Sequence, residues 1–186
     1  LILDEIQPGF GRTGSFFEFE NHNISPYILV MGKGMGGGLP IGAFSSSKKF
    51  MKLFEIKPRL GHITTFGGNP LSCAAGTATL QALTQDGLID NAEKMGELFR
   101  DGLERLKEKH TIIREIRGKG LMIGIELKFE VKDILMEGIE KNLLLLYSGR
   151  NILRLLPPLV ISEEDVTRSL EILDELLTNE ESRRNG

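Results

Sequence analysis

The chain has 186 residues, of which 40% are hydrophobic and 26% charged, and its 23 basic and 26 acidic residues leave a formal net charge of −3. These values are typical of a globular protein, and they exclude a disordered tail and a nucleic-acid binder that works through bulk positive charge. The single cysteine, Cys73, excludes an internal disulfide and a multi-cysteine metal site, and no apolar run approaches the roughly 20 residues of a membrane span. We therefore expect a cytoplasmic protein with no metal site and with neither a nucleic acid nor a membrane as partner.

Residues 1–5 predict a buried strand that ends in two carboxylates, Asp4 and Glu5. Three successive aliphatic residues, with no turn or charged leader before them, are typical of a strand inside a parallel sheet, which has neighbours on both edges and helices on both faces. We therefore expect the chain to be a fragment, with much of its fold upstream of Leu1.

Glycines and prolines interrupt regular structure in three segments of the first half, residues 7–14, 32–40 and 62–70. The first segment follows the initial strand, the second follows a short predicted strand at 27–31, and the third precedes a helix of small residues predicted from about 71 to 83. Open α/β sheets bind ligands at the carboxyl ends of their strands. We therefore expect the chemistry of the protein in these three loops.

The second half begins with an amphipathic helix, predicted from residue 91, whose apolar residues recur at three- and four-residue spacing. The further predicted elements are a strand at 121–127, a helix at 131–141, strands at 143–147 and 152–155, and a final helix with Ser162 as its N-cap. This β-α-β-β-α order predicts an α+β subdomain. We place the domain boundary near residue 88 and expect the polar end, residues 179–186, to be frayed.

Two nucleotide-binding patterns occur in part. Asp4 and Glu5 at a strand end match the Walker B pattern of nucleotide hydrolases, but the matching P-loop G-x-x-x-x-G-K-[ST] is absent from the sequence. The glycines of residues 32–37 formally match a dinucleotide fingerprint, yet Gly38 and Pro40 prevent the helix that should hold the pyrophosphate. The hydrolase interpretation stays open only if a P-loop lies upstream.

Lys33 is a lone amine at a strand end among glycines. Such a lysine is often no more than a solvated charge in a turn. A lysine with open space around it is also what a Schiff-base enzyme requires, because the amine must reach an aldehyde and later move protons.

The loop sequences bear a close resemblance to a known family. Residues 3–14 read LDEIQPGFGRTG, residues 32–42 read GKGMGGGLPIG and residues 64–70 read TTFGGNP, and RGKGLM at 117–122 and LRLLPPL at 153–159 continue the pattern. In this order the motifs resemble the class III pyridoxal-phosphate-dependent aminotransferases, and within that class they are most similar to the acetylornithine, ornithine and putrescine enzymes.

The resemblance implies an α/β architecture, that of the fold-type-I transferases dependent on pyridoxal phosphate (PLP). Residues 1–88 would be the C-terminal part of the PLP-binding large domain, and residues 89–186 the α+β C-terminal small domain. It also implies a homodimer whose two active sites are shared between the subunits.

The resemblance assigns roles to six residues. Asp4 corresponds to the carboxylate that pairs with the pyridinium nitrogen of the cofactor, and Lys33, 29 residues later, to the Schiff-base lysine that moves the proton. Gln7 corresponds to the residue that contacts the ring hydroxyl, although this chain has Pro8 where the family usually has threonine.

The other three correspond to groups that bind anions. Thr65, with Thr64 beside it, resembles the hydroxyl that reaches the phosphate of the other subunit's cofactor. Arg154 resembles the guanidinium that holds the α-carboxylate of the substrate.

The implied reaction moves an amino group from a basic amino acid or amine to an oxo acid such as 2-oxoglutarate. We expect the 186-residue chain to be inactive alone, because the resemblance places a phosphate loop and a ring-stacking aromatic residue upstream. Two alternatives remain: a nucleotide hydrolase that uses Asp4 and Glu5, and a non-catalytic remnant that keeps the motifs by descent.

Overall fold

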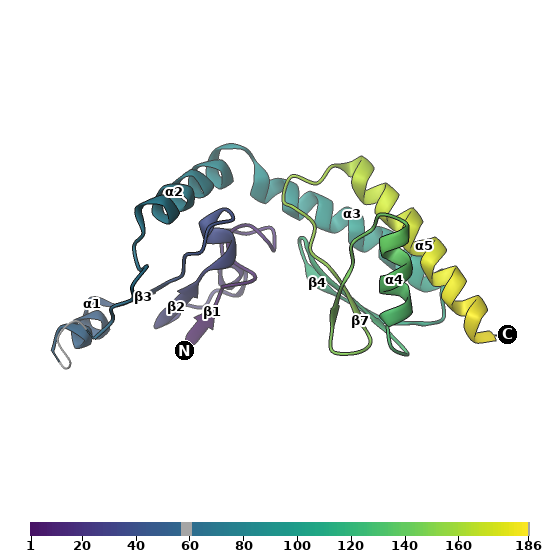
Figure 1. Ribbon diagram of the computed structural model, residues 1–186, viewed down its shortest axis with the longest axis horizontal. Helices are drawn as coiled ribbons and strands as arrows, with labels where there is room; N and C mark the ends of the chain where they lie inside the picture. Colours follow the sequence, from purple (N-terminus) through teal and green to yellow (C-terminus); the bar gives the residue numbers. More distant parts are fainter. Residues whose placement is uncertain (57–60, 186) are drawn as a thin grey trace. The chain divides into compact units, whose positions relative to one another are not determined.

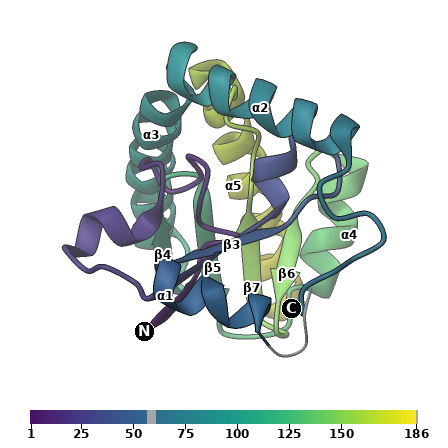
Figure 2. The same cartoon turned by 90° about the vertical axis from the view of Figure 1, so that its left-hand side faces the viewer.

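The computed structural model describes residues 1–56 and 61–185 and divides into two compact units, Leu1–Ile89 and Asp90–Gly186. Figure 1 shows the elements of both units, and Figure 2 gives a second view. No helix in the described part of the chain is both long and apolar enough to cross a membrane.

The first unit contains a three-stranded sheet in the order β1-β2-β3. The predicted strands β1 (Ile2–Asp4) and β2 (Ile28–Met31) pair in parallel, with Asp4 opposite Val30. The third strand, β3 (Ala43–Ser46), runs antiparallel to β2 and was not expected from the sequence. Its four residues, Ala-Phe-Ser-Ser, carry too short an apolar pattern to identify a strand, and the pairing with β2 defines it.

The crossover between β1 and β2 contains a short 3-10 helix, η1 (Glu18–His22), and a cluster of phenylalanines. The ring of Phe10, which is 5% exposed, lies 5.6 Å from that of Phe16 and 5.4 Å from that of Phe17. These tilted and edge-on contacts give the connection an apolar core of its own.

Helix α2 (Pro70–Gln85) confirms the predicted helix of small residues, and it packs on η2 (Lys33–Gly36). Asn69 caps it, because its Oδ1 accepts hydrogen bonds from the backbone N–H groups of Leu71 at 3.0 Å and Ser72 at 3.3 Å. A Cβ added at Gly76 would lie 3.1 Å from the carbonyl oxygen of Met35, so a residue without a side chain suits this approach. Two short elements, α1 (Lys48–Met51) and η3 (Lys52–Glu55), lie between β3 and α2.

The second unit is an antiparallel sheet, in the order β4-β5-β7-β6, with helices on one face (Figure 1). Its strands are β4 (Ile113–Lys119), β5 (Met122–Leu127), β6 (Leu146–Ser148) and β7 (Ile152–Leu155), and its helices are α3 (Leu88–Lys109), α4 (Lys132–Glu140) and α5 (Glu163–Asn185). The apolar sheet face and the helices share a core that includes Phe99, Leu103, Ile125, Leu153 and Leu177.

Strand β4 corrects the predicted β-α-β-β-α order, because a strand precedes the one expected at 121–127. Its sequence, IREIRGK, does not alternate strictly between apolar and polar residues, and its register with β5 shifts between Ile113 and Glu115. The strand expected at 143–147 is also shorter than predicted and begins only at Leu146.

The polar end of the chain is helical, so the prediction that residues 179–186 are frayed is wrong for the part that the structure describes. Glu180 is 2% exposed, and its carboxylate lies 3.0 Å from Arg183 and 2.7 Å from Arg184. The Arg184 guanidinium in turn lies 3.5 Å from the ring centroid of Phe129. Helix propensity and these ion pairs hold the charged sequence in place.

A buried histidine joins the end of α3 to α5. His110, 1% exposed, lies with Nε2 2.6 Å from Oδ1 of Asp174 and with Nδ1 3.1 Å from Oε2 of Glu181. Lys109 also contacts Asp174, at 2.6 Å. We refer to these four residues as the His110 clamp.

Candidate active site

Asp4 and Lys33 lie at the same edge of the first sheet. Asp4 is the last residue of β1, Lys33 follows the end of β2 by two residues, and the two strands are parallel neighbours. The carboxyl ends of parallel strands meet at one edge, which is where open α/β sheets bind ligands. The structure therefore places both candidate residues, the carboxylate of Asp4 and the amine of Lys33, at the same edge of the sheet.

The Asp4 side chain is fixed by one hydrogen bond and keeps one oxygen available. Its Oδ1 accepts the backbone N–H of Ile6 at 2.9 Å, and the residue is exposed. Within the described residues no hydrogen bond engages Oδ2. The turn that follows β1 thus orients the carboxylate, and its Oδ2 can still accept a hydrogen bond from a protonated ring nitrogen.

Lys33 is exposed and has a backbone φ of 45°, in the left-handed region that residues with a side chain rarely adopt. It is the first residue of η2, preceded by Gly32, which has an extended backbone, and followed by Gly34. Strained backbone of this kind persists only where the surroundings impose it, and it clusters at functional sites. The amine makes no ion pair with any described residue.

Glu5, next to Asp4, is part of the fold. It is 3% exposed, and its two carboxylate oxygens accept the backbone N–H groups of Glu18 at 3.1 Å and Phe19 at 2.9 Å. A Walker B glutamate must orient a water molecule, and this carboxylate is already occupied by η1. The nucleotide-hydrolase interpretation therefore loses its second residue.

Gln7 lies in the turn after β1 and is half-buried. No hydrogen bond to its side chain occurs among the described residues, so the amide is available to a ligand at the same sheet edge. Pro8 follows it in the turn, and nothing in the structure explains the proline there.

Thr64 and Thr65 lie in the loop before α2, and both are exposed. The backbone carbonyl of Thr64 accepts the N–H of Gly67 at 3.3 Å, and the Thr64 hydroxyl occupies the space that a side chain at Gly67 would need. Thr65 makes no such contact. Of the two hydroxyls, that of Thr65 is the freer to reach an anion.

Arg154 lies in β7 of the second unit and is half-buried on the sheet face opposite the helices. It stands opposite Gly124 on β5, which stands opposite Arg117 on β4. No hydrogen bond or ion pair to the Arg154 guanidinium is present among the residues that the structure describes. A free, partly buried guanidinium is suited to a carboxylate from outside the chain.

Sequence reasoning missed a cluster of charged residues on the sheet face that carries Arg154. Glu126, with a side chain 15% exposed, accepts hydrogen bonds from Arg114 at 2.9 Å, from Arg117 at 2.7 Å and from Asn151 at 3.3 Å. Only the strand register, which depends on the unpredicted strand β4, places these side chains on one face with Arg154.

Comparisons with known proteins identify the family of the chain. The sequence model of aminotransferase class III matches residues 1–177. The chain therefore belongs to the class III aminotransferases, a family whose members use pyridoxal phosphate. The alternating helices and strands have the α/β fold of PLP-dependent aminotransferases.

The relatives are named for two related substrates. The acetylornithine aminotransferase of Caldanaerobacter subterraneus subsp. tengcongensis is 47% identical over 96% of this chain and 44% of its own length. The ornithine aminotransferase of Toxoplasma gondii has a TM-score of 0.93 and is 34% identical over 100% of this chain and 44% of its own length. The structure of that protein shows partial occupancy of PLP at its active site. The acetylornithine aminotransferase of Elizabethkingia anophelis has a TM-score of 0.89 and 36% identity. The chain thus spans less than half the length of the relatives that it matches.

The donor set suits the family's cofactor. One carboxylate oxygen of Asp4 and the amine of Lys33 lie at one sheet edge without competing ion pairs among the described residues. A cofactor with a basic ring nitrogen and an aldehyde needs these two groups, and the glycines after Lys33 let backbone approach it closely.

Proposed function

We propose that residues 1–186 belong to an aminotransferase that moves an amino group from acetylornithine, ornithine or a similar basic amine to an oxo acid such as 2-oxoglutarate. The observation that carries the proposal is the placement of Asp4 and Lys33 at the ends of two paired parallel strands, in a chain of this family. Residues 1–88 serve as part of the cofactor-binding large domain and residues 89–186 as the small domain.

Asp4 and Lys33, at the sheet edge, have different roles in the reaction. Bound pyridoxal phosphate supplies an aldehyde for the lysine and a ring that accepts electrons. Asp4 keeps the ring nitrogen protonated, and Lys33 holds the cofactor and then carries a proton to and from the reacting carbon of the substrate. A positioned proton-transfer group of this kind typically contributes about 10²–10⁴-fold to the rate.

The remaining polar groups orient the ligands. Gln7 contacts the ring hydroxyl, and Thr65, with Thr64 beside it, contacts the phosphate of the cofactor held by a second copy of the chain. We accordingly propose a homodimer with shared sites, in the cytoplasm. Neither the Thr65 hydroxyl nor the Gln7 side-chain amide has a hydrogen-bond partner among the residues that the structure describes, which supports these roles.

Arg154 binds the α-carboxylate of the oxo acid. Its support is the absence of any partner for the guanidinium among the described residues, on a sheet face that the helices of its own unit leave open. A planar guanidinium can hold a carboxylate with two parallel hydrogen bonds.

The first experiment locates the cofactor. It uses an extended form, in which residues 1–186 are preceded by the segment of the Caldanaerobacter relative that they leave unmatched. The protein is incubated with pyridoxal phosphate, reduced with borohydride and digested, and mass spectrometry should find the pyridoxyl group on Lys33. The variant Lys33→Ala should lose that label, whereas Lys52→Ala should keep it.

A folded extended form without a label on Lys33 would refute the proposed function and leave the non-catalytic remnant. The 186-residue chain, tested in parallel, should show no transaminase turnover, and turnover by it would refute the requirement for the additional segment.

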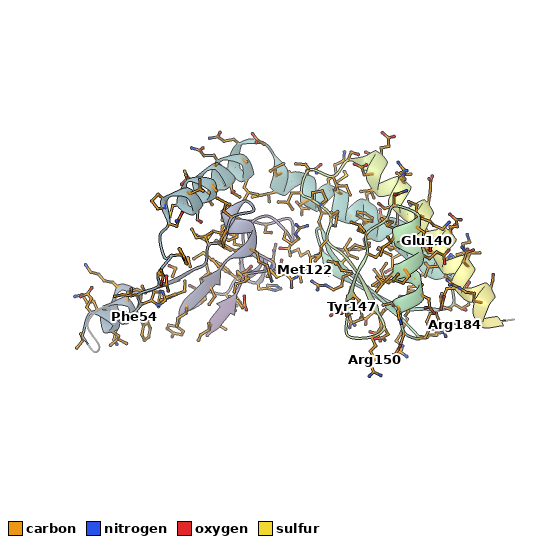
Figure 3. All side chains as sticks on the ribbon, viewed as in Figure 1. Phe54, Met122, Glu140, Tyr147, Arg150 and Arg184 are labelled. Carbon is orange, nitrogen blue, oxygen red and sulfur yellow. The ribbon has the colours of Figure 1, made fainter. Side chains whose placement is uncertain are left out.

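A second experiment concerns Arg154. In the extended form, Arg154→Ala should raise the KM for 2-oxoglutarate by about 10- to 100-fold. This is the loss of affinity expected when charge-assisted hydrogen bonds to one carboxylate are removed. Arg150→Ala, in the exposed turn between β6 and β7 (Figure 3), should leave it unchanged. An unchanged KM in Arg154→Ala would remove the carboxylate-binding role.

A further inference from the structure

Three aromatic rings meet at the start of the loop that carries Thr65. They belong to Phe44 on β3, to Phe54 on η3 (Figure 3) and to His62, three residues before Thr65. The His62 ring lies edge-on to both phenylalanines, with its centroid 5.2 Å from that of Phe44 and 5.7 Å from that of Phe54. The two phenylalanine rings lie 5.6 Å apart. We refer to these three residues as the His62 cluster.

The His62 cluster is attached to the sheet of the first unit. Phe44 stands opposite Val30 on β2, so its ring belongs to a paired strand. The N–H of Gly61 donates to the backbone carbonyl of Phe54 at 3.3 Å, which joins η3 to the residue before His62. Edge-on aromatic pairs are stabilised beyond the area that they bury. The chain is therefore held at residues 61 and 62, just before the two threonines.

The other end of the loop is held by its own hydrogen bonds. The N–H of Asn69 donates to the carbonyl of Phe66 at 3.2 Å, and the Asn69 side chain caps α2. The N–H of Gly67 donates to the carbonyl of Thr64 at 3.3 Å and closes a turn around Thr65. Thr65 is exposed, and its hydroxyl has no hydrogen-bond partner in the part of the chain that the structure describes. A short segment attached at both ends thus presents this hydroxyl.

We propose that the His62 cluster positions the Thr65 hydroxyl for the phosphate of pyridoxal phosphate, with His62 and Phe54 as positioning residues that do not touch the cofactor. A loop that is already ordered in its binding conformation loses less entropy when the ligand binds, so the affinity is higher. Without the ring of His62, the segment that leads to Thr65 loses one of its attachments. This inference rests on the proposed role of Thr65.

The test measures the Kd of the extended form for pyridoxal phosphate and for pyridoxal by equilibrium dialysis. Both compounds carry the aldehyde, and only the first carries a phosphate. In Thr65→Ala the Kd for pyridoxal phosphate should rise about 10- to 100-fold, because a hydrogen bond to a charged group is lost. In His62→Ala it should rise about three- to tenfold, because the contact is loosened and not removed. The Kd for pyridoxal should stay the same in both variants.

Phe54 and Phe50 form a matched pair of substitutions. Phe54→Ala should raise the Kd for pyridoxal phosphate as His62→Ala does, whereas Phe50→Ala should leave it unchanged. The two phenylalanines are equally exposed, at 39% and 40%, but the ring contact of Phe50 is with Tyr27. The conservative variant His62→Phe keeps a ring at this position and should keep the original Kd.

A double variant shows whether His62 acts through Thr65. In Thr65→Ala/His62→Ala the Kd for pyridoxal phosphate should equal that of Thr65→Ala alone, since the hydroxyl that His62 positions is already gone. Thermal melting checks that each variant is folded, and if His62→Ala does not fold, Phe54→Ala gives the same test through the second ring.

A raised Kd in Thr65→Ala with an unchanged Kd in folded His62→Ala would overturn the positioning role and leave the proposed function intact. Additive effects in the double variant, equal weakening of pyridoxal binding, or loss of affinity in His62→Phe would overturn it as well. An unchanged Kd in Thr65→Ala would instead refute the proposed role of Thr65, and the inference with it.

Discussion

Lys33 has a backbone conformation that costs folding free energy. A residue with a Cβ atom at φ 45° is less stable than in the right-handed region by roughly 1–2 kcal/mol, and glycine avoids that cost. The neighbouring positions of the loop are glycines, yet this position keeps a side chain. The strain is consistent with selection of the amine for its chemistry at the expense of stability.

The strain predicts an inverted order of stability at this residue. Lys33→Gly should be more stable than Lys33→Ala by about 0.5–1 kcal/mol, since relief of the strain exceeds the entropy that glycine loses on folding. Urea denaturation of the 186-residue chain measures both. Lys52, at φ −61°, is the matched control, where alanine should be the more stable replacement. An alanine variant more stable than the glycine variant at residue 33 would contradict the strain.

At the scale of elements, the sequence identified those with a clear apolar period or a cap. Helix α2 was located by its run of small residues after the Gly-Gly-Asn-Pro turn, although it begins at Pro70, and the apolar spacing from residue 91 located most of α3. Strands β3 and β4 were missed because their partners, rather than their own patterns, define them. Asp4, Lys33 and Arg154 were identified from motifs, whereas the contacts of Glu126 with Arg114 and Arg117 depend on the register of the missed strand β4.

The last turns of α5 show how tertiary contacts stabilise a charged segment. Ending the chain at Thr178 would remove buried Glu180 together with Glu181, a partner of His110. Loss of one partner of a buried hydrogen-bonded group costs about 1–3 kcal/mol, so we expect the second unit to lose about that much. Urea denaturation followed by circular dichroism measures this, and Ser182→Ala on the same helix should change it by less than about 0.5 kcal/mol. If the truncated chain is as stable as the full chain, residues 179–186 contribute nothing to the fold, as the prediction of a frayed end implies.

At the scale of the whole molecule, the His110 clamp makes the second unit sensitive to acid. Hydrogen bonds from Lys109 and then His110 lower the pKa of Asp174. Burial raises the pKa of Glu181, but hydrogen bonds from His110 and from the N–H of Ile112 outweigh it, and the net pKa is lowered. The folded state therefore binds fewer protons than the unfolded state near these pKa values.

The sign of the shifts gives the expected pH dependence. The two carboxylates contribute fully above their ordinary pKa of about 4, and the contribution is lost as the pH falls through the lowered folded values. The chain has two tyrosines and no tryptophan, so a Tyr27→Phe variant leaves Tyr147 as a reporter of the second unit. Its urea midpoint should fall between pH 5 and pH 2, and Asp174→Asn/Glu181→Gln should flatten that fall, whereas exposed Glu108→Gln should not. A fall of equal steepness in the double variant would exclude the clamp as its cause.

Asp4 and Lys33 lie close together in the sequence, and this bears on the order in which the chain folds. They are 29 residues apart, whereas the contacts of His110 with α5 join residues 64 and 71 apart. Loop-closure entropy rises by about 0.6 kcal/mol for each doubling of length, and contacts near in sequence generally form first. During synthesis, the aspartate and the lysine leave the ribosome more than a hundred residues before α5 does. The chemical pair can therefore meet while the second unit is still being translated.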